Sequence, residues 1–592
     1  MDLKGILKNR GKFGAAGMLC FTLLGTNGYG QNSVTFNVGE PIAVVEQEVF
    51  GLLMEVTLGR QWKGNGSIFM GQKSLNNNEA TFGMRTSVIE AFKECGVGAV
   101  QFPGGCAANG YEWDRSLNPS NVVGVDQFIE FCKLTGAEAM ISGKPTGSDA
   151  AQNLAFAKYI IETLDYPLKW FKIGNEIWGG CGTNYTNGYT NGFKTNVDRF
   201  KDLMATEKGK NLKFIAAANA MEGNYSWIPT WYNDIGDVVD AIEYHDYIYY
   251  PNDISSSNPT TSNYWTIMNS VFVGDFHDHL VNQIVPRMKQ ADPTNKVKAC
   301  VDEWGDWLKG DNWMQTITVM DAISAGGHLN QLIQNADVVG AACLAQGVNC
   351  IHSIVNISES GQMVITPAGY VFKLYKPHHA NNAKALPVTS SSFEKANGNV
   401  PAVSTVATID DNGTVNISFT NCDLSNNRNV KVTLNNLQGN YSVLSAEVVT
   451  GPQYTSTNPF GGAEVVNIKP LDESAVSLDN NEVNVTLPSK SVVMVRLDRP
   501  DALNSRQIKN KGADAFSIRA GSHGVIITSM KELASPVTVT LYRLDGKTVL
   551  ESGNFMSGKT CTLGKNITGT GVFLVKITGP EVNLSQQVVL AK

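Results

Sequence analysis

The chain has 592 residues, 42% of them hydrophobic and 17% charged, a balance that excludes a disordered chain, a coiled coil and a histone-like basic protein. Its 47 Lys and Arg residues against 54 Asp and Glu residues give a net charge of −7. Nucleic acid and anionic membranes are therefore not expected as partners, whereas a neutral ligand suits such a surface. The length predicts roughly two to four domains.

The first 30 residues have the pattern of a secretory signal peptide. Basic residues within positions 1–12 precede an apolar stretch over 13–24, and small residues follow to residue 30. The apolar stretch is too short to span a bilayer, and no other run of ~18 apolar residues occurs, so the mature protein is expected to be soluble. The cysteines beyond this segment form no C-x-x-C pair, so zinc and redox motifs are not expected.

From residue 46 to 379, short β-rich runs alternate with amphipathic helical runs such as 87–95, 126–134, 151–164 and 317–333. The strand candidates are 50–56, 99–102, 138–143, 170–176, 213–219, 241–247, 298–304 and 339–346. Eight such repeats predict an α/β fold, a closed (β/α)8 TIM barrel. A doubly wound open sheet is the alternative, but no G-x-G-x-x-G follows the first strand, which disfavours a nucleotide site.

Beyond the barrel the pattern changes to alternating short strands. Residues 380–498 predict an antiparallel β-sandwich, to which the segment 33–38 could add a strand. The polar stretch 499–514 predicts a linker, and residues 515–592 predict a small C-terminal all-β module.

Two glutamates close predicted barrel strands, and active sites of such barrels lie at the carboxyl ends of the strands. Glu176 ends the fourth strand in KIGNEIWG, and Glu303 ends the seventh in CVDEWGDW. Such a pair can divide acid/base and nucleophile roles, although two rim salt bridges are the alternative. Trp178 and Trp304 follow these glutamates and are candidates for stacking on sugars, with ordinary core packing as the alternative.

IGNE and DEW at these places resemble the large clan of barrel glycosidases with catalytic glutamates on strands four and seven. Within that clan the chain is most similar to glycoside hydrolase family 51, the α-L-arabinofuranosidases. The resemblance covers about residues 46–498. Its further motifs are FGLLMEVTLGR (50–60), FPGGCAANGYEW (102–113), EYHDY (243–247), LAQGVN (344–349) and TPAGYVFKLYKPH (366–378).

The resemblance implies a retaining double displacement with Glu303 as nucleophile and Glu176 as general acid/base. Glu176 must then be protonated, so we expect its pKa to be raised by burial and by its negative neighbour. Asn175 would hydrogen-bond the sugar 2-hydroxyl, and His245 would lie near the acid/base. The remaining expected substrate-binding residues are Glu55, Tyr247, Gln346, Trp178, Trp304 and Cys106.

The chain departs from that family in the second-strand loop. Gln101 and Cys106 stand where the family usually has Arg and Asn, which puts the arabinofuranoside specificity in question. Cys106 and Cys181 fall on the rims of the second and fourth strands, so they could approach each other across the mouth. A disulfide is one state of this pair, but two free cysteines are favoured.

The C-terminal module resembles the sorting domain of the type IX secretion system of Bacteroidetes. The matching features are VTVTLYRLDGKTVLESG (537–553), GVFLVKI (571–577) and a short final strand rich in Gln and Val. The alternative is a small carbohydrate-binding sandwich, which needs aromatic side chains exposed on one face. The resemblance implies secretion machinery as a partner and a secreted or cell-surface location.

The leading hypothesis is a secreted retaining α-L-arabinofuranosidase acting on hemicellulose or arabinan, with a polysaccharide or oligosaccharide as its partner. The alternatives are an endo-β-glycanase of the same clan and a non-catalytic carbohydrate-binding surface protein. No metal or organic cofactor is expected, since acid, base and nucleophile are all side chains. The family often forms oligomers, so a homo-oligomer stays open.

Overall fold

A computed structural model describes residues 32–57, 61, 67–68, 83–115, 123–217, 225–310 and 313–499, together with the strands of the C-terminal module and short stretches beside them. The predicted signal peptide, residues 1–30, and nearly all of the predicted linker, residues 499–514, lie outside the described residues.

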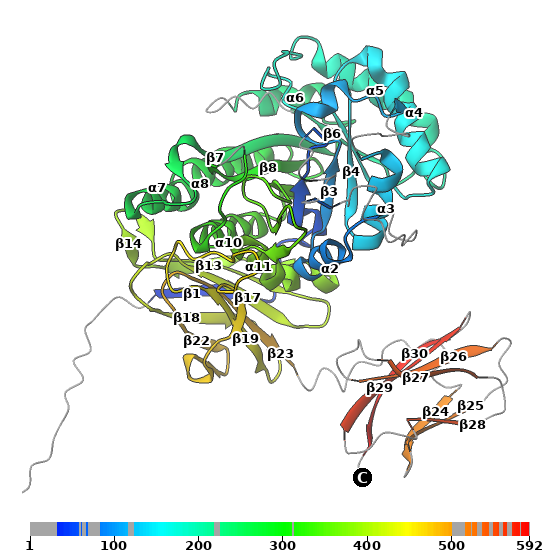
Figure 1. Cartoon of the computed structure of the whole chain (residues 1–592), viewed down its shortest axis with the longest axis vertical. Helices are drawn as coiled ribbons and strands as arrows, with labels where there is room; N and C mark the ends of the chain where they lie inside the picture. Colours follow the sequence, from blue (N-terminus) through cyan, green and yellow to red (C-terminus); the bar gives the residue numbers. More distant parts are fainter. Residues whose placement is uncertain are drawn as a thin grey trace, which may run out of the picture.

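Eight parallel strands close into a barrel in the order of the chain (Figure 1). They are β2 (Gly51–Leu53), β3 (Ala99–Phe102), β4 (Glu138–Gly143), β5 (Trp170–Ile173), β6 (Lys213–Ala216), β7 (Ala241–Ser255), β8 (Lys298–Lys309) and β9 (Val339–Ala345). β7 and β8 run beyond their predicted ends because they stay paired outside the barrel, as far as Ser255 opposite Lys309. The closed parallel barrel confirms the predicted fold and excludes the open sheet.

Helices surround the barrel and pack their apolar faces on its strands (Figure 1). They are α2 (Thr86–Cys95), α3 (Val125–Thr135), α4 (Ala150–Lys158), α5 (Tyr189–Met204), α6 (Trp227–Ile235), α7 (Thr261–Phe272), α8 (Asp275–His277), α9 (Val285–Ala291), α10 (Val319–Gln334) and α11 (Pro367–Tyr375). Local signals set their limits: α3 ends at Gly136, whose φ of 80° suits a glycine cap, and α11 begins with Pro367 after the capping residue Thr366.

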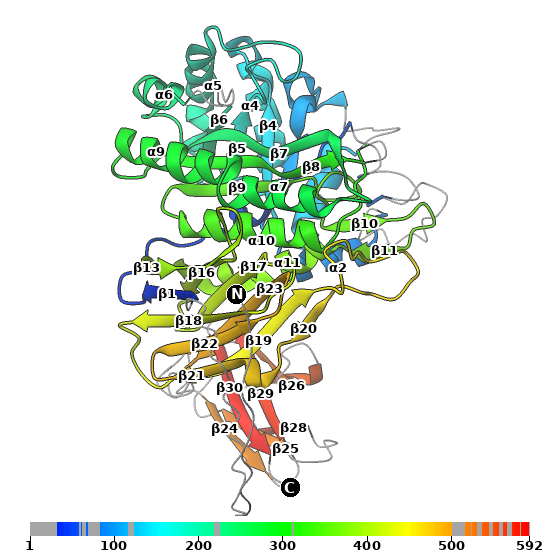
Figure 2. The same cartoon turned by 90° about the vertical axis from the view of Figure 1, so that its left-hand side faces the viewer.

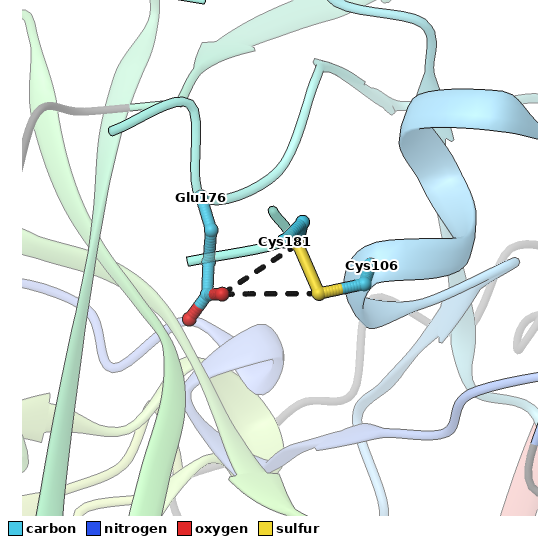
Figure 3. Close-up of side chains that lie close together, drawn as sticks. All are labelled: Cys106, Glu176 and Cys181. Carbon is cyan, nitrogen blue, oxygen red and sulfur yellow. Dashed lines mark hydrogen bonds between the residues drawn. A yellow bond between two sulfur atoms is a disulfide. The ribbon is translucent and has the colours of Figure 1, made fainter. Parts of the chain in front are cut away.

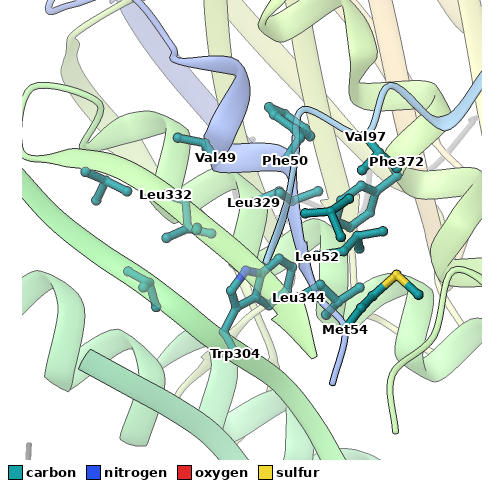
Figure 4. Close-up of a cluster of buried hydrophobic side chains, with 14 of the residues drawn as sticks. Val49, Phe50, Leu52, Met54, Val97, Trp304, Leu329, Leu332, Leu344 and Phe372 are labelled. Carbon is teal, nitrogen blue, oxygen red and sulfur yellow. The ribbon is translucent and has the colours of Figure 1, made fainter. Parts of the chain in front are cut away.

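The largest core lies between the barrel strands and the surrounding helices, and Figure 4 shows the part of it beside α10 and α11. Leu52 and Leu344 from β2 and β9 meet Leu329 of α10 and Phe372 of α11 around Trp304, and all five are fully buried. Large side chains packed at this density fix the relative positions of strand and helix, and hence of the strand ends that carry polar groups.

Two antiparallel sheets form the sandwich that follows the barrel (Figure 2). In sheet order, one contains β13 (Val388–Ser392), β1 (Asn32–Asn37), β18 (Arg428–Asn435), β22 (Glu482–Leu487) and β21 (Val476–Asp479). The other contains β12 (Lys384–Ala385), β16 (Val403–Ile409), β17 (Val415–Asn421), β23 (Ser491–Asp498), β19 (Ser442–Thr450) and β20 (Ile468–Pro470). The segment predicted at 33–38 is thus part of the sandwich, where β1 lies parallel to β18.

Buried hydrogen bonds join the sandwich to the barrel helices. The Tyr375 hydroxyl donates to Oδ1 of Asn330 at 2.8 Å, and Nδ2 of Asn330 lies 3.4 Å from Thr420 Oγ1 of β17. The Tyr264 hydroxyl of α7 donates to the carbonyl of Cys422 at 2.6 Å. Buried polar contacts of this kind require one docking geometry, so the sandwich acts as a rigid support for the barrel.

The C-terminal module has two small antiparallel sheets. One contains β24 (Phe516–Gly521), β25 (Gly524–Ser529) and β28 (Thr560–Leu563); the other contains β27 (Val549–Phe555), β26 (Val537–Arg543), β29 (Gly571–Gly579) and β30 (Val582–Leu590). Phe516 and Phe573 are both buried in its core, so neither offers the exposed ring that a carbohydrate-binding face needs. Within the described part of the chain, no helix is both long and apolar enough to cross a membrane.

Candidate active site

Glu303 projects from the middle of β8 into the barrel mouth. Its side chain is 8% exposed, and its neighbour across the β7–β8 pairing is His245. The Tyr247 hydroxyl, from β7, donates a hydrogen bond to Glu303 Oε2 at 2.7 Å. A short bond from a neutral donor stabilises a carboxylate and fixes the direction of its second oxygen.

Glu176 lies in the loop that follows β5. Its φ of 43° is uncommon for a residue with a side chain, so the surrounding structure holds this backbone in place. Gly180 lies against it: a Cβ at Gly180 would stand 2.3 Å from Glu176 Oε2, so only glycine lets the loop pass this close. The side chain is 20% exposed and is open to a ligand in the mouth.

His245 links the two glutamates. Its Nδ1 lies 3.0 Å from Glu176 Oε1 and 3.5 Å from Glu303 Oε2, while Nε2 lies 3.2 Å from Asp302 Oδ1. A carboxylate oxygen of Glu176, one of Glu303 and a ring nitrogen of His245 all lie within 4.8 Å of one another. The structure therefore brings together the two glutamates that the sequence predicts, with the predicted histidine between them.

A general acid is expected to have a raised pKa and a nucleophile a lowered one. In the free protein the pKa values of the two glutamates shift in the opposite directions. Burial pushes the pKa of Glu176 up, but the hydrogen bond and the positive charge of His245 outweigh it, so this pKa is lowered. Burial of Glu303 outweighs the attraction of His245 and raises its pKa to about 7. The expectation of a raised Glu176 pKa is wrong for the free protein, because it did not include a histidine cation beside that carboxylate.

Burial alone would lower the pKa of His245, yet the nearby carboxylates of Glu303, Asp302 and Glu176 raise it well above its ordinary value. These charges therefore favour the protonated imidazole, whose Nδ1 lies one hydrogen bond away from Glu176.

Cys106 and Cys181 form a disulfide beside Glu176 (Figure 3). The expectation of two free cysteines is wrong: the loops after β3 and β5 bring the two Cα atoms to 5.2 Å, well within bridging range. The sulfurs of Cys181 and Cys106 lie 3.5 and 3.8 Å from Glu176 Oε2. The bridge joins the two loops and covers one face of the carboxylate with atoms that carry no proton.

Asn109 makes a second link between these loops. Its Nδ2 donates to the carbonyl of Asn175 at 2.7 Å, and the Asn175 N–H donates to Asn109 Oδ1 at 2.9 Å. Sequence reasoning did not identify Asn109, which lies within the quoted PGG-loop motif. Its polarity there was the available signal, because asparagine commonly satisfies backbone groups of neighbouring loops.

Glu55 and Gln346 lie at the ends of the first and eighth strands, as predicted. Gln346 Oε1 accepts a hydrogen bond from Nε2 of the buried Gln61 and lies 3.4 Å from the Glu55 N–H. A Cβ at Gly105 would meet Glu55 Oε2 at 2.7 Å, so the PGG loop needs glycine where it passes that carboxylate. Burial raises the pKa of Glu55.

The two predicted tryptophans are in different environments. Trp178 is partly exposed, and its ring lies edge-on to His245 with centroids 5.4 Å apart, so it borders the site. The prediction that Trp304 binds substrate is wrong. Glu303 faces the mouth, whereas Trp304 faces the helices, where it is fully buried and stacks on His328. Strict alternation does not hold along this part of β8, because its pairing with β9 shifts between Val301 and Trp304 and Asp302 also points into the barrel.

A buried charge cluster beneath the glutamates was missed. Lys172, Glu243 and Asp302 point into the barrel, and the Lys172 ammonium lies 2.7 Å from Glu243 and 2.6 Å from Asp302. Gln101, noted only as a departure from the family, donates through Nε2 to the carbonyl of Asp302 at 2.6 Å. The available signal was a lysine and a glutamate inside otherwise apolar strand runs, WFKI and AIEY.

Within the described residues, four groups of three side chains offer possible metal ligands within 4.8 Å of one another. Cys106 and Cys181 are bonded to each other, and both ring nitrogens of His245 face carboxylates, so the groups at the mouth are already engaged. The remaining group, Asp306, Asp321 and His352, lies buried behind β8. That the protein uses no metal or cofactor remains a prediction.

Comparisons with known proteins show that the chain is similar to arabinofuranosidases. A family model described as the alpha-L-arabinofuranosidase C-terminal domain matches residues 302–491. An intracellular exo-alpha-L-arabinofuranosidase of Bacteroides ovatus is 26% identical over 78% of this chain and 95% of its own length. An intracellular exo-alpha-(1->5)-L-arabinofuranosidase of Streptomyces lividans is also 26% identical, over 46% of this chain and 47% of its own.

Among solved structures, the family 51 arabinofuranosidase of Xanthomonas axonopodis pv. citri is 25% identical. It covers 79% of this chain and all of its own, with a TM-score of 0.69. The arabinofuranosidase of Thermotoga maritima, 21% identical with a TM-score of 0.64 over 79% of this chain and 99% of its own, shares the fold. These similarities support a relationship to glycoside hydrolase family 51 and mark the chain as a glycoside hydrolase that resembles the arabinofuranosidases.

Proposed function

We propose that this glycoside hydrolase is a retaining exo-acting α-L-arabinofuranosidase, with Glu303 as nucleophile and Glu176 as general acid/base. The observation that carries the proposal is the separation of the two glutamates, whose nearest ligand oxygens lie within 4.8 Å. Retaining glycosidases hold their carboxyl groups ~5–5.5 Å apart, whereas inverting enzymes leave ~6.5–9.5 Å for a water molecule. The names of the relatives supply the sugar and the exo mode of attack.

In the first half-reaction an oxygen of Glu303 attacks the anomeric carbon. The bond from that carbon to the leaving oxygen breaks, and Glu176 donates a proton to the leaving oxygen. Because the charges around His245 favour its protonated form, the proton first passes from Nδ1 to Glu176 Oε1, and Glu176 then gives this proton to the leaving oxygen. Tyr247 holds Glu303 in line by its 2.7 Å hydrogen bond.

In the second half-reaction Glu176 accepts a proton from water, and the water oxygen displaces Glu303 from the anomeric carbon. Glycosylation has by then removed the charge of Glu303, which is one of the charges that keep His245 protonated. The pKa of His245 falls while the intermediate lasts and rises again when Glu303 leaves as a carboxylate, so the proton taken from water can then pass from Glu176 back to His245 Nδ1. Asn175, Glu55 and Gln346 would hold the sugar hydroxyls meanwhile.

Aromatic rings extend the site outward along β7 and β8. Trp307 contacts Tyr247, Tyr249 and Trp313 with ring centroids 5.2, 5.1 and 4.7 Å apart. Tyr249 and Trp313 are 56% and 45% exposed. Exposed rings suit the apolar faces of sugars, so this surface favours a polymeric substrate. The same feature keeps an endo-β-glycanase as the second candidate.

The test uses an aryl α-L-arabinofuranoside as the sugar donor and methanol as the acceptor. NMR then determines the anomeric configuration of the methyl arabinofuranoside that forms first. The proposal expects methyl α-L-arabinofuranoside as the first product. The β-anomer would indicate inversion and would reject the double displacement. No turnover of arabinofuranosides, together with chain cleavage of β-glucan or xylan, would favour the endo-glycanase, and Glu303→Ala is the inactive control for either.

We also propose export of the protein, with residues 1–30 removed and the C-terminal module 515–592 acting as a type IX sorting signal. Three features support export. Residues 1–30 have the pattern of a signal peptide, and the C-terminal module is all-β with its Phe516 and Phe573 rings buried rather than exposed for sugar binding. The Cys106–Cys181 disulfide is of a kind that persists in oxidising compartments. N-terminal sequencing of protein from culture medium and from cells is the test. An intact N-terminus on protein confined to the cytoplasm would reject export.

A further inference from the structure

Lys172 is a lysine buried in the middle of the barrel. It lies on β5, three residues before Asn175, and its side chain is 2% exposed. Charged amines are almost never this buried unless they are paired, because leaving water carries a desolvation penalty of several kcal/mol. The catalytic scheme above assigns Lys172 no step, so the reason for its burial lies in its contacts.

The ammonium has three close oxygen partners and a fourth more distant one. Nζ donates to Asp302 Oδ2 at 2.6 Å and to Asn175 Oδ1 at 2.7 Å, and it lies 2.7 Å from Glu243 Oε2. Gln101 Oε1 lies at 3.5 Å. An ammonium has three protons, and these bond to Asp302, Asn175 and Gln101, while Glu243 adds a second negative charge beside it. These partners come from β3, β7, β8 and the loop after β5.

The contact with Asn175 fixes the orientation of that amide. Lysine can only donate, so the oxygen of the Asn175 amide must face Nζ and its NH₂ group must face away. Nδ2 lies accordingly on the side of the disulfide, 3.7 Å from Cys181 Sγ. Asn175, itself fully buried, therefore points a donor, not an acceptor, toward the disulfide that lies against Glu176.

The contact with Asp302 connects the ammonium to the glutamates. Asp302 bridges Lys172 and His245, and His245 contacts both Glu176 and Glu303. The positive charge of Lys172 lowers the pKa of Glu303 and of Glu176. The titratable groups around this path are Glu176 after β5, Tyr189 on α5, Glu243, His245 and Tyr247 on β7, Cys300, Asp302 and Glu303 on β8, and Cys343 on β9.

We propose that Lys172 is a positioning residue with two separable effects: its N–H groups fix the orientation of the Asn175 amide beside Glu176, and its charge favours the ionised form of Glu303. The inference rests on the proposed retaining hydrolysis. Lys172 would then influence both the recognition of the sugar hydroxyl and the pH range of activity, although its buried side chain touches no substrate.

Lys172→Met removes donors and charge together. We expect kcat/KM to fall by roughly 10²-fold and its acidic limb to move to higher pH, since Glu303 then needs a higher pH to ionise. The preference for an arabinofuranoside over its 2-deoxy analogue should shrink by about tenfold relative to wild type. The measured quantity is the ratio of kcat/KM for the two substrates in the variant, divided by the same ratio in the wild type. The different intrinsic reactivities of the two substrates cancel in this quotient.

Lys172→Gln separates the two effects, because it keeps N–H donors and loses the charge. It should move the acidic limb and largely retain the 2-deoxy preference. Glu243→Gln is the matched control, since it leaves the Lys172–Asn175 contact intact and should keep the wild-type preference. In an Asn175→Ala background, Lys172→Met should change the preference no further.

Thermal unfolding of each variant identifies any that does not fold, and Lys172→Gln then carries the test if Lys172→Met is lost. Folded Lys172 variants with an unmoved acidic limb and an unchanged 2-deoxy preference would overturn the inference, as would equal losses on both substrates without a pH shift. Absence of arabinofuranosidase activity in the wild type would instead reject the proposed function.

Discussion

Glu176, after β5, and Glu303, on β8, are the same residue type and meet at one barrel mouth, yet their surroundings differ. Glu303 sits inside a continuous strand, is almost fully buried and has a raised pKa. Glu176 sits on a loop in an uncommon backbone conformation, is more exposed and has its pKa lowered by His245. The difference teaches that position in the scaffold, not residue type, sets the pKa of each glutamate, and that the charges around His245 favour its protonated form.

The largest expected effect comes from removing either glutamate. Glu303→Ala should lower kcat/KM by roughly 10⁴-fold or more on every substrate, because no other side chain can form the covalent intermediate. Glu176→Ala should lose a comparable factor only on natural linkages, since aryl groups that leave as stable anions need no proton.

Azide sharpens that comparison. Azide should rescue Glu303→Ala to give the β-arabinosyl azide and rescue Glu176→Ala to give the α-anomer. NMR of the azide products distinguishes the two. The same configuration from both variants would mean that the roles are not divided in this way.

The next effect tests the role of His245 in the difference between the glutamates. His245→Gln removes the cation that lowers the pKa of Glu176 and of Glu303. Both pKa values should rise, so the acidic limb of kcat/KM should move to higher pH, with about a tenfold to hundredfold lower maximum. A profile with the wild-type acidic limb would show that His245 does not set these charges.

Of the two glutamates, only Glu176 lies against the disulfide. Replacing both Cys106 and Cys181 by Ser removes a link between residues 75 apart in the chain, which should lower the free energy of unfolding by about 2–4 kcal/mol. It should also lower kcat more than it raises KM, since Glu176 loses a supporting contact. Denaturant unfolding and steady-state kinetics measure the two effects, and Cys343→Ser, a buried free cysteine, is the control.

The smallest expected effect concerns Asp306, which lies on β8, the strand that carries Glu303. Burial raises the pKa of Asp306 from its ordinary 3.8 to about 7, so the folded state holds a proton that the unfolded state releases. This contribution to stability is complete below pH 3.8 and is lost as pH rises through 7. Asp306→Asn should therefore gain a few degrees in Tm relative to wild type between pH 5 and pH 8. A pH-independent difference would mean that Asp306 is ionised throughout.

Much of this arrangement was predictable because its rules are local. Strands β3 and β4 begin and end where the apolar runs predict, and strand ends in a barrel meet at one mouth, which places Glu176 near Glu303.

The rest depended on contacts between distant loops and strands. The Cys106–Cys181 bridge required the path of two loops, and the lowered Glu176 pKa required the position of His245. Lys172 was visible as a charge in an apolar run, but its partners on three other strands were not.

The most direct test of the division between the glutamates is to identify which one becomes glycosylated. Glu176→Ala, mixed with a dinitrophenyl α-L-arabinofuranoside and quenched in acid, should accumulate the covalent intermediate because its hydrolysis lacks a base. Peptide mass spectrometry should then find one pentosyl unit on Glu303. A pentosyl unit on another residue, or none while the variant still releases dinitrophenol, would contradict the account.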